Sequence, residues 1–174
     1  VLDDEQSLSI DSLHDQNQFT YSLIIPENLV PTNIQESYEY ICQPIISALN
    51  EIGLNPEFAP LNDIILNGQK ISGNAQTRKG GVVLQHGTLL MDVDVDKMFR
   101  LLLVPDEKYR DKLVASVKKR VTGINKHLSK PLEFIDLVNL IQKHFVKFLS
   151  VTKIQELELV DLKVDLSLYQ DKYQ

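Results

Sequence analysis

The segment from Asn62 to Thr88 holds the densest group of side chains that could carry chemistry, and Lys70 is its most specific member. Lys70 follows an Asn-Gly pair, which favours a two-residue turn between strands, and Asp63 is expected beside it on the facing strand. A lysine ammonium is a compact positive charge suited to phosphate or carboxylate oxygens, so a lysine on a rigid hairpin can bind an anionic substrate. The alternative interpretation is a solvated strand lysine paired with its neighbour.

Three glycine-containing stretches lie near this hairpin. Ser72-Gly73-Asn74-Ala75 is small and polar, and it predicts either a nest of backbone amides that binds anions or an ordinary turn. Lys79-Gly80-Gly81 predicts a tight turn. It is not a nucleotide-binding phosphate loop, because the required spacing of glycines before a Lys-Ser/Thr pair is absent. His86-Gly87-Thr88 interrupts an apolar strand, which indicates either a functional position or a hydrogen-bonded core histidine beside a bulge.

The other nucleophilic and metal-binding residue types are better explained by structure. Cys42, the single cysteine, falls within the apolar stripe of a helix and is expected in the core. His127 and His144 are expected on helix surfaces or at helix ends, and the four histidines show no metal-ligand spacing. The alternating carboxylates from Asp92 to Asp96 lack the glycine and terminal glutamate of a calcium loop.

Strands must position the candidate residues. The stretch from Phe19 to Ile25 alternates with a period of two and ends at Pro26. The polar stretch 73–81 leads into a mostly buried strand from Val82 to Met91. The Asn-Gly turn predicts the pairs Leu66–Gln69, Ile65–Lys70, Ile64–Ile71 and Asp63–Ser72. Alternation then places Ile64, Leu66 and Ile71 on one face, and Asp63, Lys70 and Ser72 on the other.

The first predicted helix begins at a capping box, Thr32 to Gln35, and carries an apolar stripe from Ile34 to Ile52. Gly53 suits the left-handed end of this helix, and Pro44 should kink or split it.

Two further helices follow, one from Pro105 to about Thr122 and one opened by Pro131 with a stripe from Phe134 to Phe148. Asp94 or Asp96 could cap a short helix through Leu103, and a bulged strand is expected over residues 154–166. The mixed order predicts an α+β fold, with a largely antiparallel mixed sheet and helices packed against it.

Composition narrows the classes of function. The 174 residues suit one domain, 1–174, and 43 % hydrophobic and 24 % charged residues are ordinary for a globular protein. With 24 acidic against 18 basic residues there is no basic footprint, so we expect no nucleic-acid partner. No apolar run reaches the ~18 residues of a membrane span and no signal peptide opens the chain, so we expect a cytoplasmic protein without a membrane partner.

Several of these motifs together resemble one family. Asn62-Asp63, Gly68-Gln-Lys70-Ile-Ser-Gly-Asn-Ala75 and Leu84-Gln-His-Gly-Thr-Leu-Leu90 resemble the signature of lipoate–protein ligases, which belong to the biotin/lipoate ligase and octanoyltransferase superfamily. The segment Val104 to Lys112 resembles the archaeal form, and His14-Asp15 with Phe19 to Ser22 resembles the family's strand after its glycine-rich motif. The resemblance covers most of the chain and implies the family's catalytic-domain fold.

The resemblance implies that lipoate and ATP, usually with Mg²⁺, give lipoyl-adenylate and pyrophosphate, after which the lipoyl group passes to a lysine of an acceptor domain. Lys70 would be the active-site lysine, in contact with the carboxylate and the α-phosphoryl oxygens. Asn62 and Asp63 would hold the nucleotide and the metal ion, and His14 the lipoyl side. Ser72, Gly73, Asn74 and Ala75 would line a phosphate-binding turn, and His86, Gly87 and Thr88 the strand beneath the site.

The acceptors implied are lipoyl domains of 2-oxoacid dehydrogenases or the H protein of glycine cleavage. The chain ends where the family's core domain usually finishes, and in archaeal relatives an accessory part can be a separate polypeptide. We therefore expect either an accessory subunit or an incomplete activity of the core alone.

The chain departs from the family upstream of His14. The family's Arg-Arg-x-x-Gly-Gly-Gly motif is absent there, and Ser9-Ile-Asp-Ser-Leu13 stands in its place. Glu5 to Leu13 resembles an earlier family segment, so we expect a loop to be missing between Leu13 and His14.

Two other functions stay open at this point. Cysteine-dependent octanoyl- and lipoyl-transferases resemble the chain from Gly73 to His86, but they need a nucleophilic cysteine close to the hairpin, where this chain has Pro60-Leu-Asn-Asp63. A non-catalytic family member that acts as a binding subunit is the other alternative.

Overall fold

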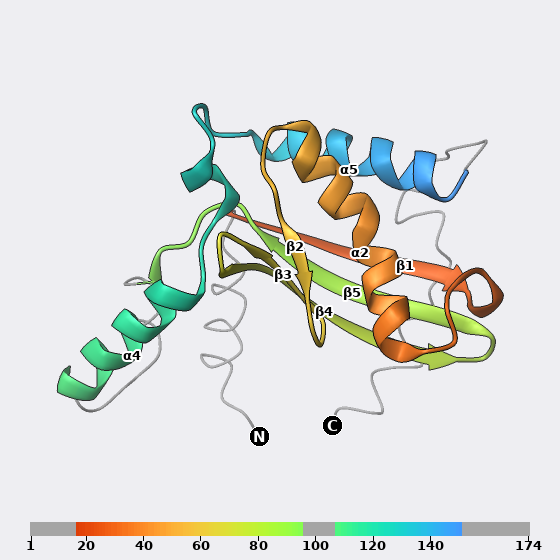
Figure 1. The fold of residues 1–174 in the computed structure, drawn as a ribbon, viewed down its shortest axis with the longest axis horizontal. Coiled ribbons are helices and arrows are strands. Elements are labelled where there is room, and N and C mark those ends of the chain that lie inside the picture. The colour runs from red at the N-terminus through yellow and green to blue at the C-terminus, as the bar shows by residue number, and fades with distance from the viewer. Residues whose placement is uncertain (1–16, 96–106, 151–174) are drawn as a thin grey trace, which may run out of the picture.

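The computed structural model describes residues 17–95 and 107–150, which form an antiparallel sheet with helices against it (Figure 1). The sheet has five strands in the order β1-β5-β4-β3-β2, and α2 and α5 contact each other beside it. This arrangement confirms the predicted α+β class. The elements are β1 Gln18–Pro26, η1 Glu27–Leu29, α2 Ile34–Glu51, β2 Glu57–Ala59, β3 Asp63–Leu66, β4 Gln69–Lys79, β5 Val82–Leu90, α4 Glu107–Arg120, η2 Ile124–His127 and α5 Phe134–Phe148.

The two faces of the sheet differ because side chains alternate along each strand. The inner face packs against α2 and α5, where buried residues form a main core and a smaller second cluster of Ile25, Val30, Ile41 and Val83. The main core includes Ile45, Leu49, Ile64, Ile71 and Leu89. The predicted strand from residue 19 to 25 is confirmed in β1, but β5 alternates between exposed and buried positions, so the prediction of a mostly buried strand is wrong.

The β3–β4 hairpin confirms the predicted turn and part of its register. Asn67 and Gly68 have φ of 51° and 77°, as a two-residue turn of this type requires, and the pairs Leu66–Gln69 and Ile65–Lys70 form. A bulge then shifts the register, so that Ser72 pairs with Ile64 and Gly73 with Asp63. Ser72 therefore lies on the buried face with Ile64, and its predicted place beside Lys70 is wrong.

β4 continues through the polar stretch that was predicted to lead into the next strand. Residues 73–79 pair with β5 from Thr88 to Val82, so backbone pairing overrides the weak strand propensity of these residues. Gly80 and Gly81 have φ of 63° and 78°, which confirms the predicted tight turn.

α2 is one helix of 18 residues that contains Pro44, so the predicted split does not occur. Its N-cap is Asn33 rather than Thr32, because the Asn33 side chain accepts hydrogen bonds from two backbone amides of the first turn, at 2.9 and 3.1 Å. Gly53 has φ of 85°, which confirms the predicted left-handed end.

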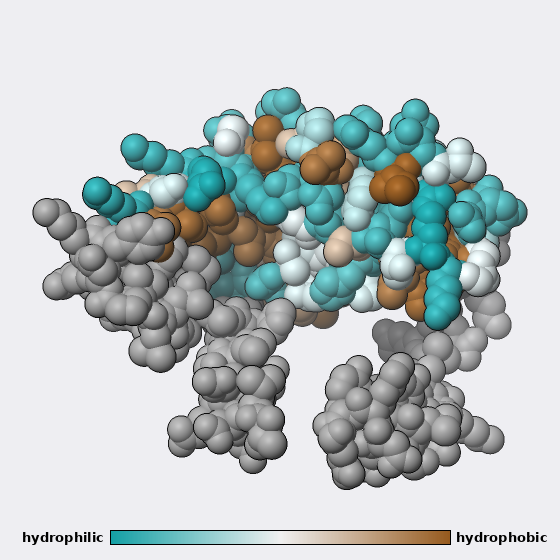
Figure 2. All heavy atoms as spheres, turned by 90° about the horizontal axis from the view of Figure 1, so that it is seen from below, coloured by the Kyte–Doolittle hydropathy of each residue, from teal (hydrophilic) through white to brown (hydrophobic). Residues whose placement is uncertain are grey.

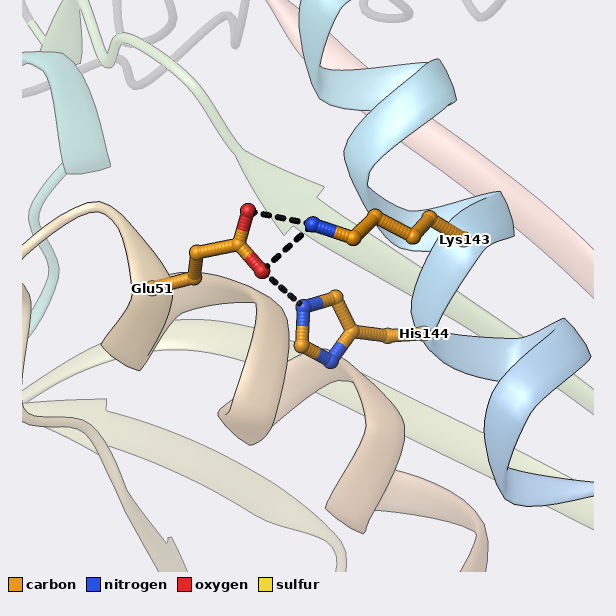
Figure 3. Close-up of polar contacts among 3 residues, drawn as sticks. All are labelled: Glu51, Lys143 and His144. Carbon is orange, nitrogen blue, oxygen red and sulfur yellow. Dashed lines mark hydrogen bonds and ion pairs between the residues drawn. The ribbon is translucent and has the colours of Figure 1, made fainter.

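α4 and α5 are confirmed as helices. α5 buries Leu137 and Ile141 of the predicted stripe, but it begins at Phe134, which is 47 % exposed. Polar contacts join α5 to the end of α2 at Glu51 (Figure 3). Lys143 Nζ lies 2.7 Å from one carboxylate oxygen of Glu51, and His144 Nε2 lies 2.9 Å from the other.

Several predictions fall on residues outside the described ranges: His14, the expected gap after Leu13, the short helix through Leu103 and the strand over 154–166. None of the helices within the described ranges is long and apolar enough to cross a membrane.

Candidate active site

Lys70 and Asp63 form an ion pair at the edge of the β3–β4 hairpin. Lys70 Nζ lies 2.6 Å from Asp63 Oδ1, with side chains 42 % and 29 % exposed. Asp63 Oδ1 accepts no hydrogen bond from a described group, so the contact is a charge pairing without directed hydrogen-bond geometry. The Lys70 side chain crosses Gly73 to reach Asp63, because a Cβ built on Gly73 would lie 2.9 Å from Lys70 Nζ. Gly73 thus leaves the space that the lysine occupies.

Cross-strand pairing extends this pair across the sheet face opposite α2, which we call the outer face. One row comprises Asp63, Gly73, Thr88 and Thr20, and the next comprises Ala75, His86 and Ser22. The structure therefore brings five predicted residues, Asp63, Gly73, Ala75, His86 and Thr88, onto one face with Lys70. Ser22 was not predicted, and its Oγ lies 3.0 Å from His86 Nδ1. The sequence could have indicated Ser22, because it stands at one of the outward-facing positions in the alternating pattern of β1.

The outer face becomes more apolar with distance from Lys70. Beyond His86 the next rows contain Ile24, which is 70 % exposed, and Leu84 and Val82, which are 36 % and 38 % exposed. Figure 2 shows separate hydrophobic areas among hydrophilic residues on the described surface seen from below. The last row also contains the exposed Lys79, opposite Val82. The outer face thus has Lys70 at one end, and at the other end exposed aliphatic side chains with Lys79 beside them.

Asn62 and Asn74 hold the loop before Asp63 against β4. Asn74 donates from its backbone N and from Nδ2 to Asn62 O, at 3.1 and 2.9 Å, and Asn62 Nδ2 donates to Asn74 O. Asn74 and Ser72 are buried on the inner face. The expected phosphate-binding turn is therefore wrong: residues 72–75 are extended in β4, and only Gly73 and Ala75 face outward with Lys70.

Position 87 has room only for glycine, because the side chains of two residues on the neighbouring strands meet there in a hydrogen bond. A Cβ on Gly87 would collide with Asn74 Oδ1 and would lie 2.7 Å from Tyr21 Cζ. Those side chains meet above Gly87, where Tyr21 Oη donates to Asn74 Oδ1 at 2.8 Å. Gln85 Nε2 in turn donates to Tyr21 Oη at 2.9 Å, and burial raises the pKa of the Tyr21 phenol. Tyr21 and Gln85 were not predicted as site residues, because they lie on the sheet face that the apolar pattern of the sequence assigns to core packing.

Cys42 is a core residue, as predicted. It is fully buried, and burial raises the pKa of its thiol to about 12. Gln85 Nε2 donates a hydrogen bond to Cys42 Sγ at 3.8 Å. A neutral, buried thiol is a poor nucleophile, since the thiolate is the reactive form.

The histidines outside the outer face have structural contacts. His127 lies 3.0 Å from Thr122 Oγ1, and His144 contacts Glu51. Within the described ranges no group of three His, Cys, Asp or Glu residues could hold a metal ion. Asp63 is committed to Lys70, so Mg²⁺ would fit there only with most of its ligands supplied by a nucleotide's phosphates and water.

Comparison with known proteins identifies the family of this chain. Residues 13–146 match the family model of the lipoyl protein ligase A/B catalytic domain. The chain is 30 % identical to octanoyltransferase LipM of Brevibacillus brevis, over 80 % of this chain and 59 % of that protein. It is 33 % identical to octanoyltransferase LipM of Bacillus subtilis, over 68 % of this chain and 51 % of that protein. The chain thus spans little more than half the length of these relatives.

Solved structures share the fold. A bipartite archaeal lipoate protein ligase from Thermoplasma acidophilum superposes with a TM-score of 0.71 at 24 % identity, covering 82 % of this chain and 55 % of that one. Biotin protein ligase from Aquifex aeolicus superposes with a TM-score of 0.57 at 12 % identity, covering 77 % and 53 %. With the family model matched over residues 13–146, the chain belongs to the lipoyl protein ligase A/B catalytic domain family.

Proposed function

We propose that the chain is the catalytic core of a lipoate–protein ligase. It activates lipoate with ATP to lipoyl-AMP and transfers the lipoyl group to a lysine of an acceptor domain, in a 2-oxoacid dehydrogenase or the glycine cleavage H protein. The observation that carries the proposal is Lys70, held by Asp63 across Gly73 at the polar end of the outer face.

Lys70 would stabilise charge in both steps. In the first, a carboxylate oxygen of lipoate attacks the α-phosphorus of ATP, the bond to the β-phosphoryl oxygen breaks, and pyrophosphate leaves. In the second, the acceptor amine attacks the acyl carbon, AMP leaves with the carboxyl–phosphoryl oxygen, and the amine loses a proton to solvent. Both steps concentrate negative charge on oxygens bonded to the reacting carbon and phosphorus. A fixed ammonium stabilises that charge without reorganising when the reaction occurs. Mg²⁺ bound to the ATP phosphates would neutralise further charge beside Asp63.

The remainder of the outer face suits an acyl chain. Successive rows on one face of a strand are roughly 6.7 Å apart, so Leu84 and Ile24 lie about 13 Å along the strands from the Asp63–Thr88 row. An eight-carbon acyl chain with its carboxyl group at Lys70 would pass Ala75 and His86 and point toward those aliphatic side chains. Burying them against the chain would contribute roughly 25 cal/mol per Å² of apolar area.

Octanoyl transfer is the second candidate, because the curated relatives described above are octanoyltransferases. A transferase of the cysteine-dependent type would store the acyl group on a thiolate. Cys42, the chain's single cysteine, is buried with a raised pKa, which favours the adenylate route in this chain.

Isotope exchange between pyrophosphate and ATP tests the proposal, with lipoate, octanoate or neither present. A ligase gives exchange that depends on the acyl acid. Lys70→Ala should reduce exchange and transfer at least ~100-fold while the protein stays folded, because both side chains of the ion pair are partly exposed to solvent. Lys79→Ala, at the far end of β4, is the matched control. Cys42→Ser should leave transfer intact.

Acyl transfer from an octanoyl thioester, with no ATP–pyrophosphate exchange, would support the second candidate. Wild-type rates in Lys70→Ala would refute the role given to that lysine.

A further inference from the structure

One segment of the chain has a strong net positive charge, whereas the chain as a whole is acidic. Residues 112–132 contain six lysines and arginines and no aspartate or glutamate. The remaining residues carry all 24 acidic side chains and 12 basic ones, so the segment is +6 and the rest of the chain −12. The six cations are all exposed, and they are Lys112, Lys118, Lys119, Arg120, Lys126 and Lys130.

This basic segment is fastened to the hairpin that carries Lys70. The backbone N of Thr122 donates to Lys70 O at 3.0 Å, and Val121 forms a parallel bridge with Lys70. Gln69, the residue before Lys70, donates from Nε2 to Lys118 O at 3.0 Å. In Figure 1 the chain passes from the end of α4 beside the edge of the sheet and on to α5. The cations at the end of α4 therefore have a fixed place next to the candidate active site.

Ion pairs within the segment do not explain why six basic side chains occur so close together in the sequence. Like charges this close in sequence repel one another, and no acidic residue within the segment offsets them. Asp92 and Asp94 line a hollow of about 540 Å³ together with Lys118 and Lys126, so part of the charge is balanced there. Lys119 and Lys130 do not line that hollow.

We propose that the basic segment is the docking surface for the acceptor domain, and that the acceptor presents aspartate or glutamate side chains beside its target lysine. This inference rests on the proposed function. The target amine must reach an acyl group held at Lys70, so the acceptor has to sit against the surface around the hairpin. Outside the segment, the described residues 17–95, 107–111 and 133–150 carry 12 acidic and 7 basic side chains, a net charge of −5. This part of the surface repels an acidic domain and the +6 segment attracts it, so the field steers the acceptor to this side.

The double variant Lys119→Glu/Lys130→Glu tests the proposal, with an isolated lipoyl acceptor domain whose target lysine has acidic neighbours. Reversing two exposed charges should raise the KM for the acceptor about tenfold, with kcat at saturation and ATP–pyrophosphate exchange unchanged. The KM of the wild type should rise with salt, and that of the variant should rise less. Lys79→Glu makes the same charge change at the far end of β4 and should leave the acceptor KM unchanged.

Two results would overturn the docking proposal. One is a wild-type acceptor KM in the double variant; the other is a raised KM for ATP, which would assign the surface to the nucleotide. Titration calorimetry of the acceptor domain without acyl donor separates this proposal from the proposed function. Suppose that the wild type shows neither ATP–pyrophosphate exchange nor acyl transfer, but binds the acceptor domain more tightly than the double variant does. The proposed function would then be wrong and the docking surface would still be supported.

Discussion

Replacing Gly73 by alanine should lower activity without lowering stability. The added Cβ would lie 2.9 Å from Lys70 Nζ and 3.0 Å from its Cε, whereas ordinary contact begins near 3.4 Å. The ammonium must therefore move by about 0.5 Å, which the flexible lysine can do while the strands stay in place. A misplacement of 1 Å at a reacting centre can cost roughly 100-fold in rate, so a shift of half that size should cost about tenfold in kcat. Alanine in a strand is favoured over glycine by roughly 0.5–1 kcal/mol, so the free energy of unfolding should be unchanged or slightly higher.

The assay is single-turnover transfer of the acyl group to the acceptor domain, together with urea unfolding of the same preparation. A double variant with Lys70→Ala provides the control, because alanine at position 73 should have no further effect once the lysine side chain is removed. Full activity in Gly73→Ala would refute the assignment of a fixed lysine position. A loss of several kcal/mol of stability would show instead that the backbone, rather than the lysine, yields to the new methyl group.

Three further predictions concern the scaffold. Gly87→Ala forces apart Tyr21 and its hydrogen-bond partner on the neighbouring strand, so urea unfolding should show a loss of about 2–4 kcal/mol; a loss below 0.5 kcal/mol would contradict this packing. Asn33→Ala removes the cap of α2 and should cost about 1 kcal/mol, whereas Asn33→Ser should retain most of it. Hydrogen bonds from Lys143 and its neighbouring histidine lower the pKa of Glu51 from its ordinary 4.5. The stabilisation by Glu51 is therefore complete above pH 4.5 and is lost as the pH falls through the lower pKa of the folded state. The difference in Tm between the wild type and Glu51→Gln should vanish below that pKa. A difference that stays constant with pH would contradict the link between the protonation of Glu51 and stability.

Local patterns predicted most of the elements. The Asn67-Gly68 turn, the period-two alternation in β1 and the glycine after α2 each depend on the conformational preferences of a few neighbouring residues. The bulge opposite Ile64 was not predictable from the hairpin alone, because pairing with β5 as well as β3 fixes the path of β4. For the same reason, the polar residues after Gly73 form a strand despite their composition.

By itself the sequence identified Lys70 and Asp63 as a charged pair on a hairpin and marked His86 and Gly87 as interruptions of an apolar strand. Only the tertiary structure decided which neighbours share a face: it turned Ser72 and Asn74 inward and placed Gly73 beneath the lysine. The physical reason is that strand alternation assigns faces only once the register is known. The register follows from contacts between strands that are distant in sequence, such as β1 with β5.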